Sequence, residues 1–146
     1  QSGVRVNCLL NWRVGMVRDQ LYPEIKVPVR LKITNAVDTK LSGYGLPYYY
    51  TFLQAEAAKA LKDYLDMRLS LEEGLRDDDY IFKPILGKAL NEKMHRVRVS
   101  NLVKSSAKKI GLDPRSVWTH TLRKSFRKVL NASSVDEDTK EALMGS

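Results

Sequence analysis

The pair His120 and Arg123 has the residue types and the spacing of a site that acts on a phosphate ester. The two residues stand at positions i and i+3, which places both side chains on one face of a helix. A histidine exchanges protons near neutral pH, and an arginine presents a planar set of donors to phosphate oxygens. The pair therefore favours phosphate binding with proton transfer, while an ordinary basic helix surface remains the simpler interpretation of the pair alone.

Other catalytic patterns are absent from the sequence. His95 and His120 are the two histidines and lie far apart, and no cysteine and histidine set has zinc-ligand spacing. The sequence contains no Gly-x-Ser-x-Gly elbow and no glycine-rich phosphate loop. We therefore expect no metal and no cofactor. Cys8 is the single cysteine, so no internal disulfide can form, which fits a reducing intracellular compartment.

Composition and charge narrow the class of protein. The chain has 146 residues, of which 43% are hydrophobic, enough for a core, and its net charge is +8. No apolar run reaches the roughly 18 residues that span a bilayer, and no signal peptide is visible. Twelve basic residues fall within 88–128, where only Glu92 and Asp113 oppose them. This excess predicts one strongly positive face and a polyanionic partner, as against a merely solvated surface.

The elements that must position these residues follow from hydrophobic periodicity. Alternation over 27–33 and a β-prone run over 48–53 predict an antiparallel hairpin whose connection, 35–45, is long and polar. Helical spacing predicts a helix or two short turns in 4–17 and helices over 57–68, 88–110, 119–130 and 135–144. The inward side chains expected are Ala57, Ala58, Leu61, Tyr64, Leu65 and Arg68 in the first of these helices, Val97, Leu102, Val103, Ala107 and Ile110 in the second, and Leu122, Phe126 and Val129 in the third.

These elements predict an α+β fold that is mainly helical, with one small antiparallel sheet in a single domain over 1–146. Gly74 is expected to end the helix over 57–68, and a short buried stretch, 80–82, is expected within the loop that follows. Thr119 or Thr121 is the expected N-cap of the helix that carries His120.

Four segments, taken in order, resemble the tyrosine recombinase (phage integrase) family. Ser2-Gly3-Val4-Arg5 resembles its first box, Thr/Ser-Gly-hydrophobic-Arg, and His120-Thr121-Leu122-Arg123 resembles its second box, His-x-Leu-Arg. The following Lys124-Ser125-Phe126 is similar to archaeal members in particular. Asp38-Thr39-Lys40 lies where the family keeps its catalytic lysine, and 136–145 resembles the helix that leads to the family's Leu-Gly-His element.

The resemblance implies a helical catalytic domain of the DNA breaking-rejoining type. Family members attack a DNA phosphodiester with a tyrosine, form a 3′-phosphotyrosyl link and release a 5′-hydroxyl, without metal or ATP. By resemblance, Arg5 and Arg123 bind the non-bridging oxygens, Lys40 protonates the departing 5′-oxygen, and His120 handles the proton of the tyrosine.

The resemblance also implies contacts with double-stranded DNA outside these four residues. Lys124, Arg127 and Lys32 are the expected phosphate contacts, and Lys32 competes with Lys40 for the role of hairpin lysine. Cys8 stands where many relatives have an acidic residue, so we expect it in a buried supporting position.

All seven tyrosines precede His120, whereas the nucleophile of the family follows the second box. We therefore expect a partial catalytic domain over 1–146 that lacks the core-binding domain and the tyrosine segment and is inactive alone. In the full-length protein we expect a synaptic tetramer on DNA, a cytoplasmic, nucleoid-associated location and an origin in a mobile element. Two alternatives stay open: an enzyme like type IB topoisomerase, and a non-catalytic basic DNA-binding module.

Overall fold

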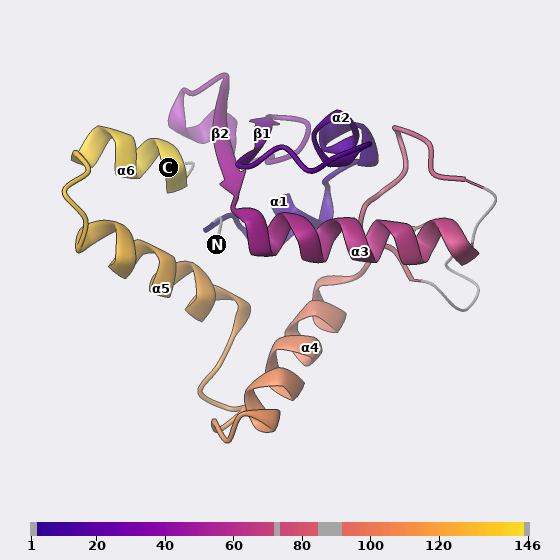
Figure 1. The fold of residues 1–146 in the computed structure, drawn as a ribbon. Helices are drawn as coiled ribbons and strands as arrows, with labels where there is room; N and C mark the ends of the chain where they lie inside the picture. The colour runs from indigo at the N-terminus through magenta and orange to yellow at the C-terminus, as the bar shows by residue number, and fades with distance from the viewer. Residues whose placement is uncertain (1–2, 72–73, 85–91, 145–146) are drawn as a thin grey trace.

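The computed structural model describes residues 3–71, 74–84 and 92–144, and all structural statements below concern these residues. A small hairpin lies above the long helix that follows it, one later helix extends below that helix, and the last two helices lie to one side (Figure 1). The elements in chain order are α1 (Val6–Leu10), the 3-10 turn η1 (Val14–Met16), α2 (Arg18–Leu21), β1 (Val29–Thr34), the 3-10 turn η2 (Leu41–Tyr44), β2 (Tyr48–Leu53), α3 (Ala55–Leu71), α4 (Arg96–Lys109), α5 (Thr119–Asn131) and α6 (Glu137–Met144). The mainly helical α+β fold with one antiparallel sheet is therefore confirmed.

The sheet has two antiparallel strands, with Val29 opposite Leu53 and Thr34 opposite Tyr48. Every second residue of β1 is buried, as the alternation predicted. The strand begins at Val29, two positions later than predicted, and Val27 before it is about half exposed. The long connection contains η2, so the predicted polar turn has a defined structure of its own.

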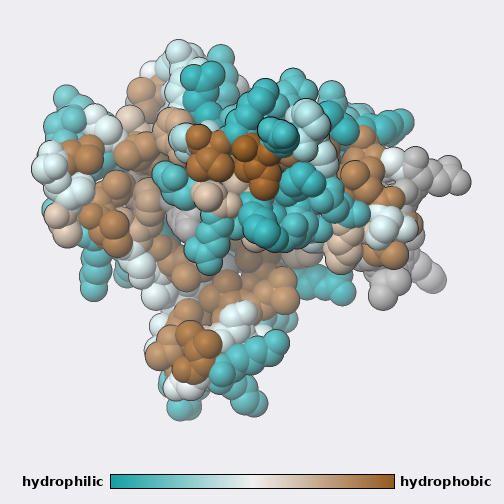
Figure 2. All heavy atoms as spheres, viewed as in Figure 1, coloured by the Kyte–Doolittle hydropathy of each residue, from teal (hydrophilic) through white to brown (hydrophobic). Residues whose placement is uncertain are grey.

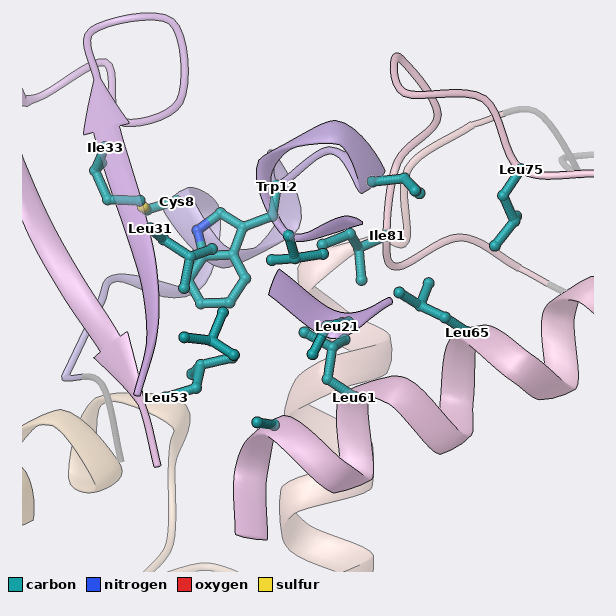
Figure 3. Packing of buried hydrophobic residues seen from close by; sticks show 14 of the residues in the cluster. Cys8, Trp12, Leu21, Leu31, Ile33, Leu53, Leu61, Leu65, Leu75 and Ile81 are labelled. Atoms are coloured by element: carbon teal, nitrogen blue, oxygen red, sulfur yellow. The ribbon is translucent and has the colours of Figure 1, made fainter. Parts of the chain in front are cut away.

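The hydrophobic core lies between the sheet, α3 and the short N-terminal helices. Trp12 is at its centre, and Leu31, Leu53, Leu21 and Leu65 approach from four different elements (Figure 3). All buried members of this cluster fall between Cys8 and Ile81. The predicted helix or two short turns in 4–17 appear as α1 and η1, which together supply the N-terminal wall of the core.

The predicted inward stripe of α3 is confirmed, including its arginine. Arg68 has no exposed surface, and its Nη1 donates hydrogen bonds to the carbonyls of Tyr80 (2.6 Å) and Ile81 (2.7 Å). These bonds explain how a charged side chain tolerates burial, because the charge is hydrogen-bonded to main-chain oxygens. They also fix the segment around Ile81, which is fully buried as predicted, while Tyr80 beside it is half-buried. The helix is described up to Leu71, and the two residues between it and the predicted stop at Gly74 lie outside the described part of the chain.

The predicted inward faces of α4 and α5 are largely wrong. Val97, Leu102 and Ile110 in α4 and its C-cap, and Leu122 and Val129 in α5, are more than half exposed, and only Ala107 and Leu130 are buried. The reason is that these helices extend away from the core, so the core does not cover their apolar stripes. Figure 2 shows hydrophobic atoms at the surface of the lower part of the molecule, where α4 lies in Figure 1.

Helix α4 begins at Arg96, not at Lys88, and the predicted first turns fall partly on residues 85–91, outside the described part of the chain. The C-terminal helices contact the rest of the described chain through α4 against α1, through α6 against β2, and through Arg123 of α5, which donates to the carbonyl of Gly3. Helix α6 begins at Glu137, two residues after the predicted start, since Asp136 caps it by accepting hydrogen bonds from Thr139. Across the described residues, every helix is too short or too polar to traverse a lipid bilayer.

Candidate active site

The residues with catalytic potential meet at one pocket of about 230 Å³. They come from three segments: the residues before α1, the hairpin connection and the first turns of α5. The pocket is lined by Val4, Arg5, Val6, Lys40, Thr119, His120 and Arg123. The structure therefore brings together all four residues that the sequence selected for catalysis, across more than 110 positions of chain.

Arg5 is held on two sides by the hairpin connection. Its Nη1 lies 2.8 Å from Oδ2 of Asp38, and its Nη2 donates a 3.1 Å hydrogen bond to the hydroxyl of Tyr44. The guanidinium also lies 5.3 Å from the centre of the Tyr44 ring. Burial alone would lower the pKa of Arg5, but the hydrogen bond and charge of Asp38 outweigh it and raise the pKa. The guanidinium therefore keeps its positive charge at the pocket wall.

Asp38 belongs to a buried hydrogen-bonded chain. The hydroxyl of Tyr49 donates to Oδ2 of Asp38 at 3.4 Å, and Sγ of Cys8 lies 3.8 Å from that hydroxyl. Burial raises the pKa of Cys8 to about 11, so the thiol stays protonated at neutral pH and donates toward Tyr49. Cys8 is buried, as expected. The carboxylate that holds Arg5 comes from the hairpin connection and not from the position of Cys8.

Lys40 lines the pocket from the residue before η2. Its backbone N–H donates to Oδ1 of Asp38 at 3.2 Å, and Leu41 next to it is fully buried, which anchors the turn. The side chain of Lys40 is exposed, and among the described residues its ammonium has no hydrogen bond or ion pair. Lys40 therefore presents a charged, unengaged amine to whatever occupies the pocket.

Arg123 connects α5 by hydrogen bonds to residues near both ends of the described chain. Its Nη1 donates to the carbonyl of Gly3 at 2.6 Å, and its Nη2 donates to the carbonyl of Met144 at 2.7 Å. Burial, followed by the nearby charge of Arg5, lowers the pKa of Arg123. Two cations thus face one pocket and repel each other, an arrangement that an anion between them would relieve.

His120 lies in the first turn of α5 and is exposed, with its side chain at the pocket. The predicted i, i+3 relationship is therefore present, since His120 and Arg123 line the same hollow. The prediction that Thr119 or Thr121 is the N-cap is wrong. The N-cap is Trp118, and Thr121 satisfies its backbone N–H through Oγ1 at 3.1 Å.

The three expected DNA contacts lie outside the pocket. Lys32 is on the exposed face of β1, with its ammonium 4.3 Å from the centre of the Tyr48 ring. Lys124 and Arg127 are exposed on α5, and Arg127 borders a different hollow between α5 and α6. Of the two hairpin lysines, it is Lys40 that borders the pocket.

Positive charge is concentrated on α4 and α5. Helix α4 contains five basic residues and α5 contains four, and neither contains an acidic residue. Helices α3 and α6, by comparison, carry acidic residues in their first turns. Helix α4 contacts both α1 and α5. The basic excess predicted for 88–128 therefore falls mainly on two neighbouring helices.

Sequence reasoning missed the supporting residues Asp38, Tyr44 and Tyr49. The sequence marks Asp38 only as a neighbour of Lys40, and Tyr49 only as part of the β-prone run over 48–53, in which it is buried. One signal for Asp38 is present in the sequence. It is an acidic residue two positions before Lys40 in the polar connection. Among the described residues, no group of His, Cys, Asp and Glu side chains is arranged to hold a metal ion.

Comparison with known proteins adds evidence at the level of the fold. No protein-family model matches this sequence, and no curated protein matches it either. Among solved structures, the chain is similar to the crystal structure of XerA recombinase, with a TM-score of 0.68 and 20% sequence identity. The chain therefore shares the fold of a part of XerA recombinase.

The match to XerA recombinase covers 99% of this chain and 43% of the XerA chain. The shared fold thus extends over the hairpin, the core and the three C-terminal helices, and includes every segment that lines the pocket. At 20% identity the similarity carries the fold alone.

Proposed function

We propose that this chain is the catalytic region of a tyrosine recombinase, which cuts and rejoins double-stranded DNA through a 3′-phosphotyrosyl intermediate. The observation that carries the proposal is the convergence of Arg5, Lys40, His120 and Arg123 on one pocket. These are the residues that the family boxes selected from sequence, and their types are those that phosphoryl transfer without a metal requires.

The proposed roles follow from the positions of the side chains. Arg5 and Arg123 donate to the non-bridging oxygens of the scissile phosphate, and their two charges offset the charge that develops in the transition state. Arg123 uses one donor on Gly3 and one on Met144, and among the described residues its other N–H groups have no partner. Those remaining donors are available to phosphate oxygens, because a guanidinium carries five N–H groups.

Lys40 and His120 supply the proton transfers. As the tyrosine oxygen bonds to phosphorus, the bond from phosphorus to the 5′-oxygen breaks, and Lys40 gives its proton to that oxygen. His120 takes the phenolic proton from the tyrosine. Reversal of the same steps rejoins the strand, and the phosphotyrosyl link conserves the energy of the phosphodiester, so neither ATP nor a metal is required.

The nucleophile is proposed to lie outside the 146 residues. None of the seven tyrosines, all of which are described, lines the pocket. Tyr44 is the one whose hydroxyl reaches a pocket residue, and it is occupied with Arg5. We accordingly propose that the 146-residue chain binds DNA but does not cleave it, and that cleavage belongs to the full-length protein.

We also propose that the full-length protein self-associates on DNA as a synaptic tetramer and acts in the cytoplasm on the DNA of a mobile element of archaeal type.

A non-catalytic DNA-binding module is the second candidate, and the basic helices α4 and α5 favour it, since nine basic residues without an acidic one bind phosphates whether or not chemistry follows. An enzyme like type IB topoisomerase would use the same pocket. It differs from a recombinase in rejoining the original ends and not exchanging them.

The deciding experiment compares Lys40→Ala with Lys26→Ala in the full-length protein. Lys26 is an exposed lysine away from the pocket, so both variants lose the same charge. The probe is a library of nicked duplexes of random sequence in the presence of EDTA, from which covalent protein–DNA adducts are captured. We expect Lys40→Ala to form adducts roughly 100-fold or more slowly, and Lys26→Ala to match the parent.

A parent protein that binds the duplexes without forming any adduct would support the binding module and reject the recombinase. Equal adduct formation by both variants would exclude Lys40 as the general acid. Among adduct-forming outcomes, joined products from two different duplexes identify a recombinase, whereas restoration of the original duplex alone identifies a topoisomerase.

A further inference from the structure

We infer that Asp38 is a positioning residue that sets Arg5 and Lys40 relative to each other, so that one carboxylate aligns the phosphate clamp and the leaving-group acid. The inference rests on the proposed function, because it assigns the roles of Arg5 and Lys40 from there.

The two oxygens of the Asp38 carboxylate have different partners. Oδ2 accepts the hydrogen bond of Arg5 Nη1 at 2.8 Å, and Oδ1 accepts the backbone N–H of Lys40 at 3.2 Å. Because the carboxylate is planar and rigid, a shift at one partner is transmitted to the other. Arg5 and Lys40 both line the pocket, whereas Asp38 does not. Asp38 therefore acts on the pocket only through its two partners.

The main chain of Asp38 is fixed as firmly as its side chain. Its N–H donates to the carbonyl of Thr34 at the end of β1, and its carbonyl accepts the N–H of Leu41 at the start of η2, at 2.9 and 3.0 Å. The side chain is 4% exposed, and Tyr49 donates to it from the core side. Hydrogen bonds to a buried carboxylate are stronger than the same bonds in water. The sheet and the core thus define where Asp38 stands, and Asp38 defines where Arg5 and the Lys40 turn stand.

Tyr44 contacts Arg5 through an exposed hydrogen bond. Its side chain is about half exposed, and its hydroxyl accepts from Arg5 Nη2. An exposed neutral acceptor exchanges readily with a phosphate oxygen, whereas the buried carboxylate does not. This contrast identifies Asp38 as the permanent partner of Arg5 and Tyr44 as the partner that phosphate can displace.

Asp113 provides a matched control for Asp38. Its Oδ1 also accepts the backbone N–H of the residue two positions later, Arg115, at 2.9 Å, and it also pairs with a guanidinium, at 3.3 Å. It differs in being exposed and in lying outside the pocket. Asp38→Asn and Asp113→Asn remove the same charge from the same local pattern, both keep the side-chain volume, and urea unfolding checks that each variant is folded under the assay conditions.

The test measures cleavage and binding separately in the full-length protein, on the nicked duplex selected by the parent. We expect Asp38→Asn to slow single-turnover cleavage roughly 10- to 100-fold, as loss of a supporting partner does. DNA affinity should change by about 2-fold at most, because the phosphate contacts along the duplex remain. Asp113→Asn should match the parent in both quantities.

A second substrate tests separately whether Asp38 acts through Lys40. Sulfur in place of the bridging 5′-oxygen leaves as a thiolate, whose pKa is far below that of an alcohol, so its departure needs no acid. We expect Asp38→Ala, which loses both acceptors, to recover part of its cleavage rate on the sulfur duplex, and Arg5→Ala to recover none. The interaction of Asp38 with Arg5 is measured separately by ¹⁵N NMR. Loss of Asp38 should merge the distinct Nη signals of Arg5.

Parent-like cleavage by Asp38→Asn and Asp38→Ala, with Arg5→Ala and Lys40→Ala inactive, would overturn the inference and leave the proposed function intact. Absence of sulfur rescue in Asp38→Ala would overturn the coupling to Lys40. Parent-like cleavage by Arg5→Ala and Lys40→Ala would instead defeat the proposed function itself.

Discussion

Arg123 and Gly3 are 120 positions apart in the sequence, and Nη1 of the first donates a 2.6 Å hydrogen bond to the carbonyl of the second. The same guanidinium donates to Met144 near the end of the described chain. Gly3 has a φ of +54°, in the left-handed region, and the ring of Phe126 fills the space beside its Cα. The glycine of the first box thus allows the N-terminal segment to pass against α5 and places its carbonyl on Arg123.

Gly3→Ala should destabilise the fold and open the contact between the N-terminal segment and α5. A Cβ at this position meets the Phe126 ring at less than 3.0 Å, and the backbone conformation is itself unfavourable for alanine. We expect a loss of roughly 1–3 kcal/mol in the free energy of unfolding, measured by urea titration. Gly43→Ala is the control, since a Cβ there meets nothing within 4 Å. Equal stability of the two variants would contradict the close packing at Gly3.

Arg68→Met should be strongly destabilising although Arg68 is far from the pocket. The methionine fills similar space but leaves the buried carbonyls of Tyr80 and Ile81 without their donor. Each unpaired buried carbonyl costs roughly 1–3 kcal/mol, so the midpoint of thermal unfolding should fall by several degrees. Arg76→Met is the control, because the Arg76 side chain is 81% exposed. A neutral Arg68→Met would mean that water replaces the guanidinium at no cost.

The stability of the protein should fall as pH rises above 9, in part through Cys8. Burial raises the pKa of Cys8 from its ordinary value of 9.0 to about 11. Between these two values the unfolded chain ionises its thiol and the folded chain does not, so the unfolded state binds fewer protons and stability decreases with pH. One such group contributes a slope of at most about 1.4 kcal/mol per pH unit.

Cys8→Ala removes this contribution. The difference in free energy of unfolding between the parent and the variant should therefore become smaller between pH 8 and pH 10. Urea unfolding at three pH values measures this difference. The pKa of Tyr49 is also raised, first by burial and then by the charge and hydrogen bond of Cys8, so the variant changes the alkaline loss from Tyr49 as well and the comparison reports both groups together. A constant difference would show that the thiol ionises normally in the folded state.

Lys32, Lys124 and Arg127 should each contribute one phosphate contact if the chain binds duplex DNA as proposed. Alanine at any one of them is expected to weaken binding to all sequences alike and to reduce the slope of log affinity against log salt by roughly 0.9. Lys59→Ala, on α3 and ion-paired with Asp63, is the matched control and should leave the slope unchanged. An equal fall in slope for all four variants would indicate attraction by net charge alone.

Hydrophobic periodicity predicted the elements that pack against neighbours close in the sequence. The alternation in β1 and the stripe of α3 describe faces that pack on the adjoining core, so Leu31, Leu65 and even Arg68 were assigned correctly. The pocket residues were found for another reason: the family boxes name Arg5 and Arg123 without any knowledge of their distance.

The same reasoning failed where burial depends on distant packing. The stripes of α4 and α5 have ordinary helical periodicity, yet Leu102 and Leu122 are more than half exposed, because periodicity gives a preferred face and not the presence of a partner for it. The role of Asp38 could not be predicted either. It depends on the approach of Arg5, 33 positions earlier, which no spacing rule within the hairpin connection contains.

The confinement of the core cluster to residues between Cys8 and Ile81 has a consequence for how the pocket holds together. Arg5 and Lys40 stand on the densely packed part, while His120 and Arg123 stand on helices with few buried side chains, a part expected to open at a lower free energy. If the chain binds duplex DNA as proposed, a duplex that contacts both parts stabilises the more weakly packed part against opening by mass action. The equilibrium that brings the two halves of the pocket together is then linked to the equilibrium for DNA binding.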